Sequence, residues 1–117
     1  MVDEFRKQRK QLSELMMGKS GQATKRFLSL DSQVYRESEV DEKTKEMLGL
    51  VASLVLRCDD CIRYHLDQCM TKGINDNELD EIFSIGLVVG GSITIPHIRR
   101  GWEFWEGLKK VNCEREE

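Results

Sequence analysis

An all-α fold is predicted for this chain of 117 residues from three observations. A single proline interrupts the chain, and no segment shows the sustained apolar–polar alternation of a half-buried strand. Apolar residues instead recur at helical spacing in segments bounded by glycine, asparagine or serine. The length suits a single domain over residues 1–117. We therefore expect one bundle of about six helices.

The first two helices are expected at residues 3–17 and 24–35. In the second, Phe27, Leu30 and Val34 recur at helical spacing. The first is amphipathic, and we expect its basic cluster to be a solvated face rather than an anion site. That cluster consists of Arg6, Lys7, Arg9 and Lys10.

The third helix is expected to be capped by Asp41, and its run from Met47 to Leu56 is apolar on nearly every side. Much of residues 82–89 is equally apolar. The length of this second run favours a helix over a buried strand. Gly49 within the first run is tolerable if another helix approaches closely there. Two such helices exceed what a chain of this size readily encloses, so the sequence predicts a homo-oligomer.

The remaining helices are placed by capping signals. The fourth helix is expected to begin at Cys58 and to stop near Gly73, because glycine suits the residue that follows a helix. Asn75 and the acids after it favour the start of a fifth helix. Pro96 suits the first turn of the last helix, and the polar tail from Val111 is expected to fray.

The fourth helix opens on the sequence CDDCIRYH, in which Cys58 and Cys61 form a CxxC motif and His65 follows. At 3.6 residues per turn, these three side chains share one face of a helix. The thiolate is the reactive form of cysteine, and a helix N-terminus and a nearby imidazole both favour it. We therefore interpret Cys58 and Cys61 as a redox pair at the start of a central helix, with His65 as its base.

Other interpretations of the redox pair remain open. The two cysteines could be buried small residues, or they could hold zinc with His65 and a fourth ligand such as His97 or Cys69. Three ligands on one straight helix would spread over about 10 Å of its axis, which fits a tetrahedral site poorly. Cys69 and Cys113 are expected to be bystanders. Four residues could line a substrate pocket or a subunit contact: Tyr64, His97, Arg99 and Arg100.

Glu46 precedes the first cysteine by twelve residues and completes the pattern E…CxxCxxxH. This pattern, with the segments GLVASLVLRCDDCIRYHL and LVVGGSITIPHIRR, resembles the AhpD-like alkylhydroperoxidases of the carboxymuconolactone decarboxylase superfamily over roughly residues 24–108. The resemblance implies a peroxidase or disulfide reductase. Cys61 would attack the peroxide and become a sulfenic acid, Cys58 would resolve it, and His65 with Glu46 would relay protons. It also implies a trimer or hexamer, no bound cofactor and an external thiol as electron donor.

The acids between the cysteines depart from the peroxidase pattern. Asp60 stands where the best-known peroxidases have histidine, next to Asp59. A carboxylate about 6 Å from a thiolate would disfavour it by roughly 1.4 kcal/mol, comparable to the contribution of a helix N-terminus. Arg57 and Arg63 are expected to compensate in part. We therefore expect a less acidic thiol pair than in a dedicated peroxidase, and a shift from fast peroxide reduction toward slower dithiol–disulfide exchange.

Charge and hydropathy narrow the classes of function. A net charge of −3 argues against nucleic acid as a partner. No apolar run is long enough for a signal peptide or a membrane helix, so we expect a cytoplasmic enzyme acting on a small hydroperoxide or disulfide. The alternative is a decarboxylase-like lyase that acts on a small carboxylated lactone through His65 or His97 and an arginine. A third interpretation is a zinc-holding, non-catalytic binding module.

Overall fold

The computed structural model describes the backbone of residues 1–116 and the side chains of residues 1–114, and all regular structure in this part of the chain is helical. The predicted all-α class and the six α-helices are confirmed. The elements are α1 (Val2–Lys19), α2 (Gln22–Val34), α3 (Glu42–Val55), α4 (Asp59–Thr71), α5 (Asp76–Gly90), the short 3-10 helix η1 (Ser92–Thr94) and α6 (Ile95–Glu116).

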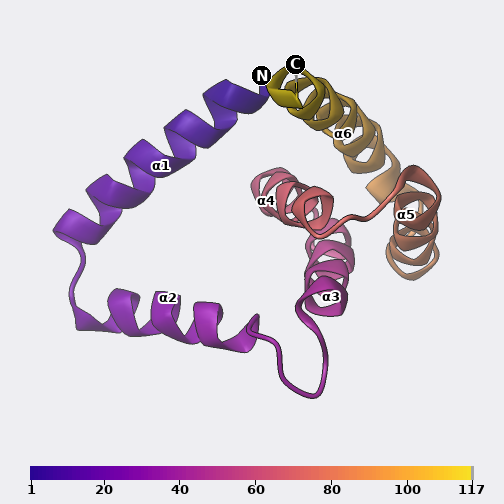
Figure 1. Cartoon of the computed structure of the whole chain (residues 1–117). Helices are drawn as coiled ribbons and strands as arrows, with labels where there is room; N and C mark the ends of the chain where they lie inside the picture. Colours follow the sequence, from indigo (N-terminus) through magenta and orange to yellow (C-terminus); the bar gives the residue numbers. More distant parts are fainter. Residues whose placement is uncertain (117) are drawn as a thin grey trace.

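The helices form a packed body and an extended arm (Figure 1). In the body, α3 packs on α4 and α5, and α4 packs on α6. The arm consists of α1, which starts beside α6 and runs outward, and α2, which returns to the body near α3. No residue of α2 is buried. The arm therefore meets the body mainly at its two ends.

The hydrophobic core lies between the four body helices. Its largest fully buried side chain is Trp105, whose indole Nε1 donates to Asp76 Oδ1 at 2.8 Å, so the buried polar group is satisfied. The apolar stripe of α6 that carries Trp105 and Leu108 therefore faces the core. Other completely buried residues are Leu50, Leu54, Ile62, Leu66, Leu79, Phe104 and Leu108.

The predicted helix ends are confirmed by their hydrogen bonds. The Asp41 side chain accepts from the Thr44 N–H at 2.7 Å at the start of α3. Asn75 and Glu78 form a reciprocal capping box at the start of α5. Gly73 has φ +86° just after α4, a conformation that glycine adopts without strain.

The predicted fraying of the tail is wrong, because α6 continues as helix from Val111 to Glu116. Val111 is partly buried against the core and extends the apolar stripe of α6 by another turn. Burial of that side chain therefore outweighs the polar composition around it.

The basic cluster on α1 is only partly a solvated face. Lys7 and Lys10 are exposed, as expected. Arg6, in contrast, donates two hydrogen bonds of 2.8 Å to the Asp67 carboxylate on α4, and the Arg9 guanidinium lies 4.0 Å from the centre of the Tyr64 ring. These contacts attach the first half of α1 to the body.

Large apolar side chains remain exposed on four helices, α1, α2, α3 and α5, and in the segments beside them. Val88 is 84% exposed and Phe27 is 68% exposed. The remaining exposed side chains of this group include Leu30, Val34, Leu48, Leu56, Ile85, Val89 and Ile93. The two apolar runs, residues 47–56 and 82–89, were expected to need contacts on every side. Within the described residues, each run is buried on one side only.

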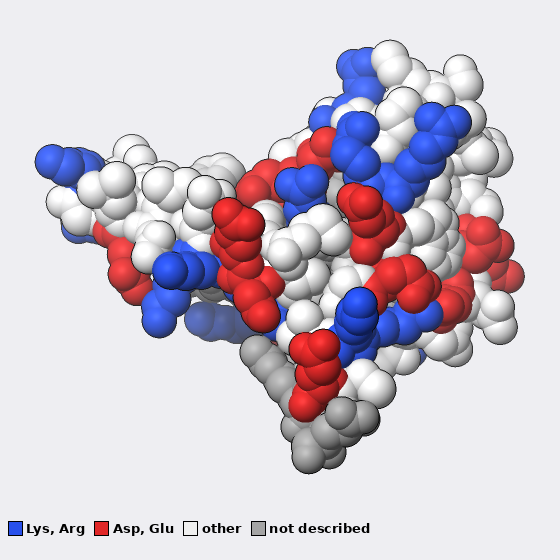
Figure 2. Space-filling view, turned by 90° about the horizontal axis from the view of Figure 1, so that it is seen from above, with Lys and Arg blue, Asp and Glu red and all other residues white. Residues whose placement is uncertain are grey.

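Charged residues of both signs are interspersed on the face seen from above (Figure 2). That face lacks the continuous positive surface that phosphate-binding proteins use. Among the residues that the structure describes, no helix combines the length and apolarity needed to span a bilayer.

Candidate active site

The redox pair lies at the first turn of α4, where the sequence predicted it. Cys58 is the N-cap residue, its sulfur accepts the Cys61 N–H at 3.2 Å, and the two cysteines are joined as a disulfide with their Cα atoms 5.3 Å apart. Cys61 is exposed and Cys58 is half-buried. The sulfurs therefore lie within the positive field of a helix N-terminus, which favours a thiolate when the bridge is reduced.

A tight turn joins the end of α3 directly to this cap. The Arg57 N–H donates to the Leu54 carbonyl at 3.0 Å, and the Cys58 N–H donates to the Ser53 carbonyl at 3.1 Å. Arg57 has φ +61°, so a residue other than glycine occupies the left-handed position of this helix-ending motif. The motif moves the chain from α3 into α4 in three residues and places Cys58 at the cap.

Glu46 and His65 form a buried pair across the α3–α4 interface, which we call the relay pair. His65 Nδ1 lies 2.8 Å from Glu46 Oε2, and both residues are less than a tenth exposed. Since a carboxylate accepts, Nδ1 carries the hydrogen in this contact and the imidazole is held in a fixed orientation. The structure thus brings together two of the four predicted site residues on adjacent helices.

The relay pair and the redox pair are connected through α4. His65 lies one turn after Cys61 on the same helix. In the disulfide form, no hydrogen bond joins either sulfur to His65 among the described residues. The predicted proton transfer between His65 and Cys61 therefore remains a prediction.

A tyrosine that the sequence did not single out completes the surroundings of His65. The Tyr35 hydroxyl lies 3.5 Å from His65 Nε2, the ring nitrogen that Glu46 leaves open. Tyr35 follows α2 and is thirty residues away in the chain, so no local motif points to it. Tyr64, one of the predicted pocket residues, packs edge-on against the same imidazole with ring centroids 5.3 Å apart.

The charge of Asp59 is countered by residues of α6. His97 Nδ1 lies 2.7 Å from Asp59 Oδ1, and Arg100 Nε donates to Oδ2 at 3.0 Å. Burial raises the pKa of Asp59, but the hydrogen bonds from His97 and Arg100 outweigh burial and hold this pKa below its ordinary value. Among the described residues, the ion pairs of Asp59 involve His97 and Arg100 and neither Arg57 nor Arg63, so the partial compensation by these two arginines stays a prediction. The exposed Asp60 has only a loose ion pair, 3.7 Å from Arg9.

The remaining cysteines and Arg99 make no contact with the redox pair or the relay pair among the described hydrogen bonds and ion pairs. Burial and then the charge of Glu46 raise the pKa of the Cys69 thiol to about 12, so Cys69 stays a neutral core residue. Cys113 and Arg99 are exposed. Among the described residues, no group of three or more His, Cys, Asp or Glu side chains is arranged to hold a metal ion. The zinc interpretation consequently finds no ligand set in this part of the chain.

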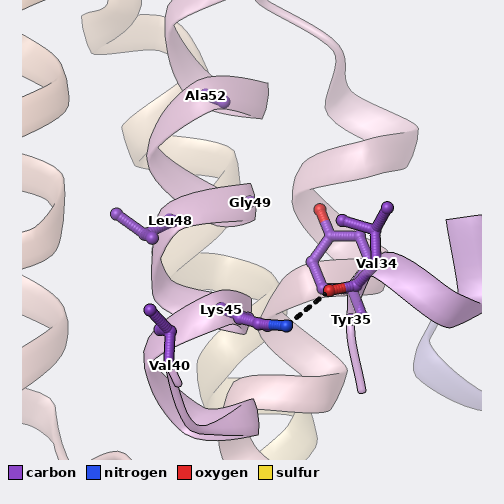
Figure 3. Close-up of a pocket in the computed structure, with 7 residues that line it drawn as sticks. All are labelled: Val34, Tyr35, Val40, Lys45, Leu48, Gly49 and Ala52. Carbon is purple, nitrogen blue, oxygen red and sulfur yellow. Dashed lines mark hydrogen bonds between the residues drawn. The ribbon is translucent and has the colours of Figure 1, made fainter. Parts of the chain in front are cut away.

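An apolar cavity of about 410 Å³ lies between the end of α2 and α3 (Figure 3). Leu48 and Ala52 of α3 line it together with Tyr35, and Gly49 forms the part of its wall next to His65. Tyr35 also lines a smaller, more polar cavity of about 230 Å³, whose wall includes Glu46 and Tyr64. Both cavities therefore approach the relay pair.

Comparisons with known proteins agree with the fold. Two crystal structures of TM1620 from Thermotoga maritima are 51% identical to this chain, with TM-scores of 0.92 and 0.91. They match 95% and 97% of this chain and 97% of that one. TM1620 is a carboxymuconolactone decarboxylase family protein for which an involvement in antioxidative response has been suggested.

A more distant structure and the family comparison extend this result. The apo form of lpg0406, a carboxymuconolactone decarboxylase family protein from Legionella pneumophila, shares the fold at 24% identity, with a TM-score of 0.67 over 91% of this chain and 88% of that one. No curated protein matches the chain. The sequence model of the carboxymuconolactone decarboxylase family matches residues 21–103, well over half of the chain. The protein therefore belongs to the carboxymuconolactone decarboxylase family.

Proposed function

We propose that the protein is a thiol-dependent oxidoreductase that reduces a hydroperoxide or a disulfide while the redox pair cycles between dithiol and disulfide. The observation that carries this proposal is the redox pair at the N-terminus of α4, followed one turn later by a buried imidazole–carboxylate pair. The helix N-terminus favours a thiolate, and an imidazole can take up and return its proton. The suggested antioxidative involvement of TM1620 is consistent with this chemistry.

In the proposed peroxidase reaction, the Cys61 thiolate attacks the terminal oxygen of the hydroperoxide and the O–O bond breaks. The leaving alkoxide takes a proton from the Cys58 thiol or through His65 and departs as an alcohol, leaving Cys61 as a sulfenic acid. The Cys58 sulfur then attacks the Cys61 sulfur, hydroxide leaves and is protonated to water, and the disulfide forms. An external thiol supplies the two electrons that restore the dithiol.

The exposures of the two cysteines support this division of roles. Cys61 is exposed, so a peroxide can reach its sulfur, whereas Cys58 is half-buried beside it as the cap. Glu46 and His65 would move the protons, because the carboxylate holds the imidazole in one orientation and stabilises its protonated form.

The ion pairs of Asp59 with His97 and Arg100 change the expectation that the redox pair exchanges slowly. A carboxylate that is neutralised by His97 and Arg100 opposes a nearby thiolate less than an isolated one does. Only the exposed Asp60 keeps most of its effect, and solvent screens it. Hydroperoxides and disulfides thus both remain in the proposal as substrates.

The pairing of Asp59 with His97 and Arg100 also weakens the lyase alternative, since these two residues contact Asp59 and are not free to anchor a substrate carboxylate.

We also propose that the protein works as a homo-oligomer, of three or six chains by the family resemblance. The uncovered apolar side chains of α2, α3 and α5 support this proposal. Light scattering of the wild type should give a multiple of the chain mass. Phe27→Glu should lower that mass, because it places a charge on the exposed apolar face of α2. A wild type that is monomeric at micromolar concentration would contradict the proposal.

The redox proposal is tested by counting free thiols by mass spectrometry before and after one equivalent of an organic hydroperoxide. The reduced wild type should lose two thiols and gain a bridge between Cys58 and Cys61, whereas Cys61→Ser should form no such bridge. Cys113→Ser serves as the matched control, since this exposed cysteine lies outside the site and its loss should leave the bridge unaffected. Survival of all thiols after peroxide and after a mild disulfide would overturn the proposal.

A further inference from the structure

Tyr35 lies outside the motif, and its side chain reaches the relay pair. Its hydroxyl lies 3.5 Å from His65 Nε2, and the two rings are tilted with their centroids 5.4 Å apart. Because Glu46 accepts from Nδ1 on the opposite side, both ring nitrogens of His65 then face a polar partner. A separation of 3.5 Å is the outer limit of a hydrogen bond, and such contacts in resting enzymes are often long.

Gly49 makes this approach possible. A Cβ atom added at Gly49 would lie 2.5 Å from the Tyr35 hydroxyl and 2.7 and 3.0 Å from Cε1 and Nε2 of His65. The hydroxyl and the imidazole therefore meet directly over the backbone of α3 at the only place where that helix offers no side chain. A glycine within a helix is unfavourable by itself, so its presence here fits a need for the close approach.

Lys45 fixes the end of α2 that carries Tyr35. Its ammonium donates to the Val34 carbonyl at 2.8 Å (Figure 3). It also donates to the Arg36 carbonyl at 2.6 Å, on the other side of Tyr35. These carbonyls lie at the negative end of the helix, where a cation is favourable. Since α2 buries no residue of its own, this lysine is a principal contact between the end of the arm and the body.

We propose that Tyr35, held in place by Lys45, is a positioning residue for His65. The hydroxyl donates to Nε2 when the imidazole is neutral and accepts from Nε2–H when the imidazole is protonated. It thereby holds the tautomer whose Nδ1–H faces Glu46, and it gives the buried imidazole a polar contact that borders both cavities. The inference deepens the proposed function and rests on it, because positioning matters for catalysis only if His65 moves protons for the redox pair.

The surroundings of Tyr35 suit this role. Burial first, and then the charges of Glu46 and Asp31, raise the pKa of Tyr35, so the phenol keeps its proton across the neutral range. The other titratable side chains that line a cavity together with Tyr35 are Asp31, Arg36, Glu42, Lys45, Glu46, Tyr64 and Lys72. A protonated phenol can serve both as donor and as acceptor.

The test compares Tyr35→Phe with Tyr64→Phe as a matched control. Both tyrosines pack against the His65 ring, but only the Tyr35 hydroxyl points to a ring nitrogen. In the reduced protein, the ¹⁵N resonances of the His65 ring report its tautomer independently of activity. Tyr35→Phe should shift the Nε2 resonance and mix the tautomers, and it should slow disulfide formation with hydroperoxide by roughly fivefold, the factor expected for one ordinary hydrogen bond. Tyr64→Phe should change neither quantity beyond about twofold.

A second variant tests the part assigned to Lys45. Lys45→Met keeps the aliphatic stem but removes the two bonds to the end of α2, so it should reproduce the Nε2 shift of Tyr35→Phe, while Lys45→Arg should restore the wild-type resonance in part. A Tyr35→Phe variant that matches the wild type in both the resonances and the rate would overturn the inference. If the wild type itself forms no bridge with hydroperoxide or with a mild disulfide, the proposed function fails, and the resonances still decide whether Tyr35 positions His65.

Discussion

Replacement of Gly49 by alanine tests the packing of the candidate site most directly. In an open helical position, this substitution stabilises a helix by about 1 kcal/mol. At Gly49, the new methyl group would fall 2.5 to 3.0 Å from the Tyr35 hydroxyl and the His65 ring. His65 cannot retreat freely, because its Nδ1 is bonded to the buried Glu46. The least costly response is a displacement of Tyr35, which is only half-buried.

The expected net effect follows from two opposing terms. Overpacking of a well-packed site costs about 1–3 kcal/mol, and the gain in helix propensity offsets about 1 kcal/mol of this cost. We expect Gly49→Ala to lower the free energy of unfolding by about 1 kcal/mol, which corresponds to a loss of roughly 4 °C in Tm for a domain of this size. The displacement of Tyr35 should also produce the His65 resonance shift expected for Tyr35→Phe.

The assay is urea and thermal unfolding, with Gly18→Ala as the matched control. Gly18 lies in the last turns of α1, and a Cβ added there would meet nothing within 4 Å. That variant should gain about 0.5 kcal/mol. The cost of Gly49→Ala should be smaller in a Tyr35→Phe background, since the atom nearest to the new methyl group is then absent. A Gly49→Ala variant as stable as Gly18→Ala would refute the proposed close approach.

Three further predictions concern the charges and thiols around the redox pair. Asp59→Asn removes the carboxylate that His97 and Arg100 contact, which leaves the Arg100 guanidinium beside α4 without its anion. The thiolate form should then be favoured, and the reduction potential should rise by roughly 30 mV. Equilibration with glutathione buffers measures this potential, and an unchanged or lower value contradicts the electrostatic reasoning. The same variant should be about 1 kcal/mol less stable at pH 7. The folded-state pKa of Asp59 lies below its unfolded value, so its stabilisation is present above about pH 4 and is lost as the pH falls through the folded pKa. Unfolding measured at a series of pH values should therefore show a deficit that shrinks as the pH falls below about 4. Finally, iodoacetamide should label the exposed Cys113 in the native reduced protein. It should label Cys69 only after unfolding, because burial keeps that thiol protonated and inaccessible. Peptide mapping that finds Cys69 labelled in the native state would show that its burial is not maintained.

The predictions from the sequence succeeded where the physical cause is local. Helix caps such as Asp41 and Asn75 act on backbone groups two or three residues away, so the residues that form them are adjacent in the chain. The placement of Cys58 at the start of α4 follows from the same short-range rules. The tail after Val111 was misjudged because its helix depends on burial against the core, which composition does not report.

Within the site, Glu46 was found through a family pattern, and the residues alone gave only a charged side chain beside an apolar run. Its 2.8 Å contact with His65 depends on the register between α3 and α4. Tyr35 gave no sequence signal, because its approach to His65 requires both the return of α2 to the body and the missing side chain of Gly49.

The class of fold, the helix that carries the redox pair and the alignment of His65 with it could all be predicted before the structure, since they follow from the spacing of residues along the chain. The charge around the cysteines, in contrast, depends on the packing of α6 against α4. The acid next to Cys58 looks unfavourable to a thiolate in the sequence, yet His97 and Arg100 lie beside it from α6, about forty residues further along the chain. Electrostatic interactions depend on distance in space, and that distance is set by the packing of helices that are remote in sequence.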